Sequence, residues 1–60
     1  MIEDLRPGAR VLIRAFDDVP EHEFVIDEVH EDCVTGFATS GPLAGCYGEP
    51  SHDLILRVLD

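Results

Sequence analysis

The stretch EFVIDEVHEDCVTGFAT, residues 23–39, decides the fold that we expect for this chain. Two runs within it, residues 24–29 and 33–39, are rich in β-branched and aromatic side chains, which pack well on a pleated surface. Between the runs lies a short polar break, His30-Glu31-Asp32. The stretch therefore predicts a β-hairpin. Because a lone hairpin is only marginally stable in water, the flanking segments must supply further strands.

The segment before the hairpin predicts one of those strands. Pro7-Gly8 is a turn signal, since Pro fixes φ and Gly accepts the positive φ of a type II turn. Residues 11–16 follow as a strand whose alternate residues, starting from Val11, face inward. Residues 17–22 are acidic and contain a proline, so we expect a loop there.

The segment after the hairpin predicts two more short strands. Gly36 indicates a bulge or a bend in the second arm of the hairpin. Residues 46–47 form a short strand, and residues 48–53 form a loop that can contain a 3₁₀ turn. Residues 54–60 fit a helix or a strand by pattern. We favour the strand, because this length is short for a helix and normal for a strand.

The five short strands, separated by turn signals, predict an all-β fold in which an antiparallel sheet rolls into a small barrel. Residues 1–60 are expected to form a single domain. The opening pattern Leu5-x-Pro7-Gly8-x-x-Val11, the acidic loop after it, the central hairpin and a 3₁₀ turn before the last strand resemble small SH3-like barrels. This resemblance covers most of the chain and implies an SH3-like five-stranded architecture.

The charge of the chain is strongly one-sided. There are 13 acidic residues against four arginines, for a net charge of −9. This balance argues against nucleic-acid binding, because affinity for a phosphate backbone comes largely from Lys and Arg. The simplest interpretation is a solvated acidic surface. The alternatives are a face for a basic protein partner, or a decoy that mimics the charge of a nucleic acid.

The sequence gives no sign of secretion or membrane insertion. Residues 1–6 lack both the basic start and the apolar run of a signal peptide. No stretch approaches the ~20 apolar residues that a membrane-spanning helix needs. We therefore expect a cytoplasmic protein with no membrane partner, in which Cys33 and Cys46 are reduced.

Four residues could form a zinc site, namely His30, Cys33, Cys46 and His52, because thiolate and imidazole ligands in a set of four suit tetrahedral zinc. Only the first two are closely spaced, whereas a zinc ribbon usually shows two close pairs. We favour the alternative, in which the cysteines are small buried residues and the histidines are exposed. On that interpretation the chain needs neither a metal nor another cofactor.

The leading hypothesis is a protein-interaction module without catalytic activity, because a chain this short has little room for a catalytic pocket. Tyr47 and Glu49 lie in a glycine-bracketed stretch and suit a contact surface, since Tyr combines apolar area with a hydroxyl group. The acidic loop contributes Asp17, Asp18 and Glu21 as further candidates. The partner is a protein, with a basic one favoured by charge, and a homodimer is a variant of the same hypothesis.

Overall fold

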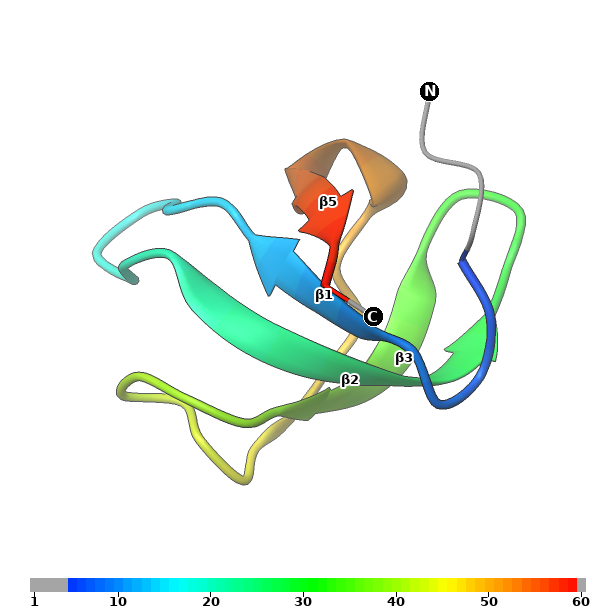
Figure 1. Ribbon diagram of the computed structural model, residues 1–60. Coiled ribbons are helices and arrows are strands. Elements are labelled where there is room, and N and C mark those ends of the chain that lie inside the picture. Colours follow the sequence, from blue (N-terminus) through cyan, green and yellow to red (C-terminus); the bar gives the residue numbers. More distant parts are fainter. Residues whose placement is uncertain (1–4, 60) are drawn as a thin grey trace.

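The computed structural model describes residues 5–59 and shows one curved antiparallel sheet (Figure 1). Residues 1–4, on which the signal-peptide expectation partly rests, and residue 60 lie outside the described part. In chain order the elements are β1 (Arg10–Ile13), β2 (His22–Val29), β3 (Val34–Ala38), β4 (Tyr47–Gly48), the 3₁₀ turn η1 (His52–Leu54) and β5 (Ile55–Val58). The strand order across the sheet is β4-β3-β2-β1-β5. This confirms the predicted all-β, five-stranded antiparallel architecture with a 3₁₀ turn before the last strand.

The sheet is rolled but not closed. Its two edges, β4 and β5, are not neighbours in the strand order. Instead, the link between them is tied to the start of β3, where Val34 N donates to Pro50 O at 3.0 Å and Cys33 forms an isolated bridge with Ser51. The link between β4 and η1 therefore contacts the start of β3, and no strand pair closes the sheet into a barrel.

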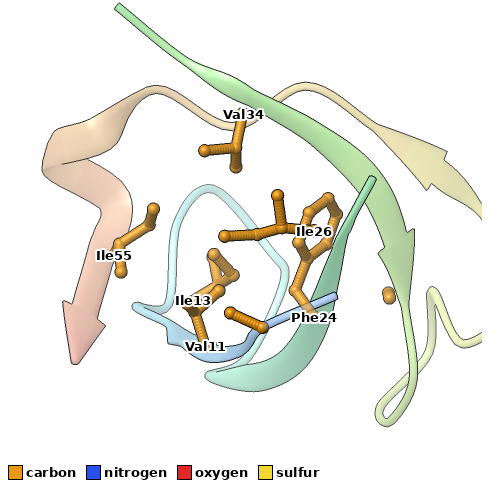
Figure 2. Close-up of a cluster of buried hydrophobic side chains, with 8 residues drawn as sticks. Val11, Ile13, Phe24, Ile26, Val34 and Ile55 are labelled. Atoms are coloured by element: carbon orange, nitrogen blue, oxygen red, sulfur yellow. The ribbon is translucent and has the colours of Figure 1, made fainter. Parts of the chain in front are cut away.

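The core fills the inside of this curve. Alternate residues of β1 and β2 point inward, as period-two burial requires, and they meet the inner residues of β3 and β5 (Figure 2). The buried apolar residues are Ala9, Val11, Ile13, Phe24, Ile26, Val34, Ala38 and Ile55. Burying such side chains provides the main favourable term in folding.

The amino-terminal entry follows the predicted turn. Gly8 has φ +90°, and Ala9 N donates to Arg6 O at 3.1 Å across the turn. Gly8 N then donates to Ile26 O at 2.7 Å, so the turn docks directly onto β2. Pro7-Gly8 thus sets the direction from which the chain enters β1.

The first strand is shorter than expected, because a tight hairpin begins soon after it. Phe16 and Val19 bond to each other through both backbone groups, at 3.0 and 2.7 Å. Asp17, at the tip of this turn, has φ +48°, in the left-handed region. The expectation that Ala15 faces inward is wrong: it is exposed, since the regular pairing of β1 ends at Ile13.

The bulge predicted beside Gly36 lies on the opposite strand. Gly36 pairs with Ile26, and the next pair joins Glu28 to Thr35, so Asp27 is the extra residue. The carboxyl-terminal segment forms strand β5, as favoured. Across residues 5–59 the structure contains no helix with the length and apolar character required to cross a membrane.

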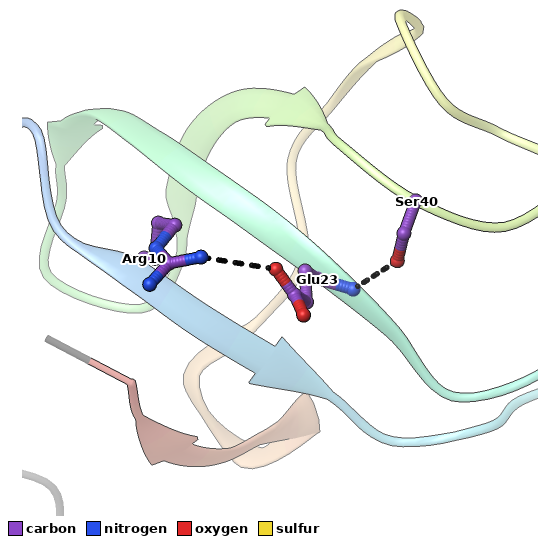
Figure 3. A network of polar contacts seen from close by, with 3 residues as sticks. All are labelled: Arg10, Glu23 and Ser40. Carbon is purple, nitrogen blue, oxygen red and sulfur yellow. Dashed lines mark hydrogen bonds and ion pairs between the residues drawn. The ribbon is translucent and has the colours of Figure 1, made fainter.

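A polar network outside the core holds the loop between β3 and β4 against β2 (Figure 3). Glu23 N donates to Ser40 Oγ at 2.9 Å, and the Glu23 carboxylate lies 3.3 Å from Arg10 Nη1. Because these two charged side chains are 47% and 41% exposed, their ion pair contributes only about 0–1 kcal/mol. The backbone bond to Ser40 is the more useful contact, since it positions the loop that precedes β4.

Candidate functional site

Two large aromatic side chains lie in contact on the outer face of the sheet. Phe37 on β3 is directly opposite Tyr47 on the edge strand β4. Their ring centroids are 5.6 Å apart and their planes are inclined at 72°, an edge-to-face arrangement that aromatic pairs favour. Both remain open to solvent, at 48% and 55% exposure.

The local hydrogen bonding explains why these two rings meet. Ala38 N donates to Cys46 O at 3.1 Å, so Phe37 and Tyr47 form the non-hydrogen-bonded pair of an antiparallel ladder. Side chains approach most closely at such pairs. The register of β3 with β4 therefore brings the two rings together.

Carboxylates border the aromatic pair. The hydroxyl group of Tyr47 donates to Glu49 Oε2 at 2.9 Å. This hydrogen bond, followed by partial burial and by the negative charge of Glu49, raises the pKa of the Tyr47 hydroxyl above its ordinary value. The charge of Glu28 adds to the same effect. The outer face thus presents an apolar centre with negative charge beside it.

Removing the charge of Glu49 should lower the pKa of Tyr47. The Glu49→Gln variant is expected to titrate closer to the ordinary tyrosine value, because the phenolate no longer faces a carboxylate. Tyr47 is the only tyrosine and there is no Trp, so ultraviolet absorbance of the phenolate reports this one group. An unchanged titration midpoint in Glu49→Gln would show that the hydrogen bond is not formed in solution.

The same shift fixes the direction of a pH effect on stability. Since the folded-state pKa of Tyr47 is raised, folding gains a contribution that is fully present below the unfolded-state pKa. That contribution is lost as the pH rises through the folded-state pKa. The loss should be smaller in Glu49→Gln.

A pocket of about 450 Å³ opens next to this surface. Its floor is the end of the core, and its walls come from the loop between β1 and β2, the loop before β4, and the segment from β4 to η1. The lining residues are Ile13, Phe16, His22, Phe24, Ala38, Leu43, Cys46, Tyr47, Gly48, Glu49, Pro50, Ser51 and Leu54. The pocket lies where the rolled sheet is not closed by strands.

The pocket accounts for part of the predicted contact surface. Tyr47 and Glu49 line it. Asp17, Asp18 and Glu21 are exposed and are not among its lining residues. The loop that carries them lies between Phe16 and His22, and these two flanking residues line the pocket.

Sequence reasoning missed two residues of this region. His22 was assigned to a loop, yet it begins β2 and is buried. The sequence does contain a signal that His22 is buried. In a strand, alternate residues face the same side, so His22 faces the same side as Phe24 and Ile26. Phe37 was assigned to a strand but not to a surface. Its exposure follows from the inward positions of Val34 and Ala38, which place Phe37 on the other face.

The four candidate zinc ligands do not come together. Within residues 5–59 no three His, Cys, Asp or Glu residues are grouped closely enough to hold a metal ion. His52 lies near Cys33, with its Nε2 3.2 Å from the Cys33 carbonyl oxygen, whereas His30 Nε2 lies 3.4 Å from Glu28 Oε1. The structure therefore lends the zinc hypothesis no geometric support.

The expectation that both cysteines are buried is also wrong. Cys46 is exposed beside the pocket, and Cys33 is half-buried. Partial desolvation and the neighbouring Asp32 carboxylate raise the pKa of the Cys33 thiol. This disfavours the thiolate at Cys33, which is the reactive form of cysteine.

Comparison of the chain with protein-family models, with curated proteins and with solved structures gave no match. Its class is that of a small rolled five-stranded antiparallel β-fold, carrying an exposed aromatic pair beside an apolar pocket. What such a molecule binds must be inferred from its own residues.

Proposed function

We propose that this protein is a cytoplasmic interaction module without catalytic activity, and that it binds a basic protein segment through the surface formed by Phe37, Tyr47 and Glu49. We call these three residues the aromatic–acid surface. The observation that carries the proposal is the solvent-exposed contact between Phe37 and Tyr47, with Glu49 hydrogen-bonded to the Tyr47 hydroxyl.

The aromatic rings supply the affinity in this proposal. Tyr and Phe are enriched at the centres of protein interfaces, where they bury much apolar area at a low cost in side-chain entropy. Phe37 and Tyr47 already contact each other in the free chain, so a partner has less side-chain freedom to restrict. Preorganisation of this kind favours binding, because less freedom is lost on association.

The carboxylates supply the choice of partner. Glu49 lies beside the rings, and the whole chain carries a net charge of −9. A surface of one sign attracts a partner of the opposite sign and speeds its approach. Asp17, Asp18 and Glu21 extend this charge around the pocket region and are proposed to steer the partner. A second copy of the chain is a poorer partner, because two molecules of this charge repel each other.

A defined peptide tests the proposal. The probe is a blocked hexapeptide of alternating arginine and leucine, whose binding is measured by calorimetry at low salt. Phe37→Ser and Tyr47→Ser should each weaken binding at least about tenfold, as expected for central interface aromatics. The matched control is Leu56→Ser on the opposite edge strand, since Leu56 and Phe37 are both 48% exposed. Leu56→Ser should leave the affinity nearly unchanged.

Salt separates this proposal from an acidic decoy. A decoy would bind through charge alone, so its binding would vanish in high salt and would not depend on Phe37 or Tyr47. The proposed module keeps part of its binding in high salt, because burial of the rings is not screened. Equal losses in Phe37→Ser and Leu56→Ser, or no loss in either, would contradict the proposal.

A further inference from the structure

A histidine lies almost fully buried in the wall of the pocket. His22 is 5% exposed and lies opposite Ile13 at the start of β2. Its ring packs beside Phe16, with the centroids 6.3 Å apart, and the loop at Gly41 covers its Cβ. The proposed aromatic–acid surface makes no use of His22.

One ring nitrogen of His22 is held by the backbone. Nδ1 lies 2.8 Å from the carbonyl oxygen of Pro20. Because a carbonyl oxygen can only accept, Nδ1 carries the proton, and Nε2 of the neutral ring is then a hydrogen-bond acceptor. The fold therefore fixes both the orientation of the ring and its tautomer.

The other ring nitrogen has no hydrogen-bond partner within the described part of the chain. Among residues 5–59, Nε2 of His22 makes no hydrogen bond. In the same part of the chain, no fully buried side-chain nitrogen or oxygen lacks a hydrogen-bond partner, so Nε2 must retain some access to solvent. His22 is also one of the residues that line the pocket.

The surroundings of Nε2 are mainly apolar. Five large hydrophobic residues line the same space, namely Ile13, Phe16, Phe24, Leu43 and Leu54. A pocket of about 450 Å³ with apolar walls and one fixed polar group has the size and composition typical of small-molecule sites. The only charged side chain that lines it within the described residues, apart from the titratable His22, is Glu49, whose charge disfavours an anion.

We infer that this pocket binds a small, neutral, mainly aromatic molecule whose single N–H or O–H group donates a hydrogen bond to His22 Nε2. The apolar walls bury the rings of the ligand, and His22 fixes its orientation. This site shares Tyr47 and Glu49 with the protein contact proposed above, but its polar contact is made by His22, which that contact does not use. Either one can therefore fail without the other.

Indole and indene form a matched pair of probes. They have nearly the same shape, but only indole carries an N–H donor. Indole should bind about three- to tenfold more tightly, which is the range expected for one additional neutral hydrogen bond. Binding is followed by the amide spectrum of the ¹⁵N-labelled chain, and the His22 ring nitrogens are recorded in the same samples. Only indole should move the Nε2 resonance, and both probes should shift the amides that border the pocket.

Two variants complete the test. His22→Phe keeps an aromatic ring in the wall but removes the acceptor, so the preference for indole over indene should disappear. Cys46→Trp places a bulky ring at an exposed position of the lining and should weaken both probes. Equal affinities for indole and indene with an unmoved Nε2 resonance, or amide shifts away from the pocket, would overturn the inference. The Nε2 measurement uses the unmodified chain, so it decides the matter even if His22→Phe does not fold.

Discussion

Replacing Gly36 with alanine is expected to remove a large part of the free energy of unfolding. Gly36 lies in the middle of β3, opposite Ile26. A Cβ atom there would collide with the carbonyl oxygen of Val25 and would come within 2.9 Å of Phe24 Cε1. Val25 belongs to β2, which is paired on both sides, so its backbone cannot move without breaking the sheet.

The effect is large because the total free energy of unfolding of so short a chain is small. Forcing extra atoms into a packed site typically costs about 1–3 kcal/mol, and a collision with backbone falls at or above the upper end. A domain of this length has roughly 3–9 kcal/mol of unfolding free energy in total. We therefore expect Gly36→Ala to lose about 3 kcal/mol or more. Urea unfolding followed by far-ultraviolet circular dichroism measures the loss.

Gly48→Ala is the matched control, because Gly48 on β4 is the direct partner of Gly36 on β3. A Cβ at Gly48 would lie 3.5 Å from Phe24 Cε2 and 4.0 Å from Pro50 Cδ, which are ordinary contacts. This variant should change the unfolding free energy by less than about 1 kcal/mol. If both alanine variants unfolded alike, the close packing of β2 against β3 in this structure would be wrong.

Truncating Ile26 to alanine should produce the second large loss. Ile26 is 1% exposed at the centre of the core, between β1 and β3. Removing its three outer carbons costs the transfer free energy of those atoms and leaves a cavity, together about 2–5 kcal/mol. In a domain of this size such a loss is a large part of the free energy of unfolding.

Leu56→Ala provides the comparison, since it also removes three carbons. Leu56 is 48% exposed on β5, where the register with β1 is irregular. Its truncation should cost less than about 1 kcal/mol. A smaller loss for Ile26→Ala than for Leu56→Ala would mean that the inner and outer faces of the sheet are assigned wrongly.

The elements that depend on local sequence could be predicted. The hairpin from β2 to β3 follows from two β-rich runs around a polar break, and the entry turn follows from Pro7-Gly8. Strand β5 was favoured over a helix on length alone, and the structure bears this out. In each case the deciding residues are neighbours in the chain, so the sequence carries the whole signal.

The features that depend on distant contacts could not be predicted. The bulge lies at Asp27 on β2, whereas the sequence shows only that Gly36 on the opposite strand is unusual. Cys46 is exposed just before the edge strand β4, although a cysteine is expected to be buried. The pocket is built from segments that are far apart in the chain, so no single sequence motif predicts it.

The candidate contact surface was predicted in part. Tyr47 and Glu49 were singled out by composition, and the structure joins them by a hydrogen bond. Phe37 could be added only when the register of β3 with β4 was known. A steering role for the acidic loop, with Asp17, Asp18 and Glu21, remains a prediction. Charges that steer a partner act at a distance, so contacts within the free chain do not test this role.

The most direct test of the proposed contact is an amide-shift titration of the ¹⁵N-labelled chain with the arginine–leucine peptide. The account predicts that the largest shifts lie at Phe37, Tyr47 and Glu49, and that they persist at reduced size in high salt. Shifts centred on Leu56 and β5, or spread evenly over the acidic surface and abolished by salt, would contradict it.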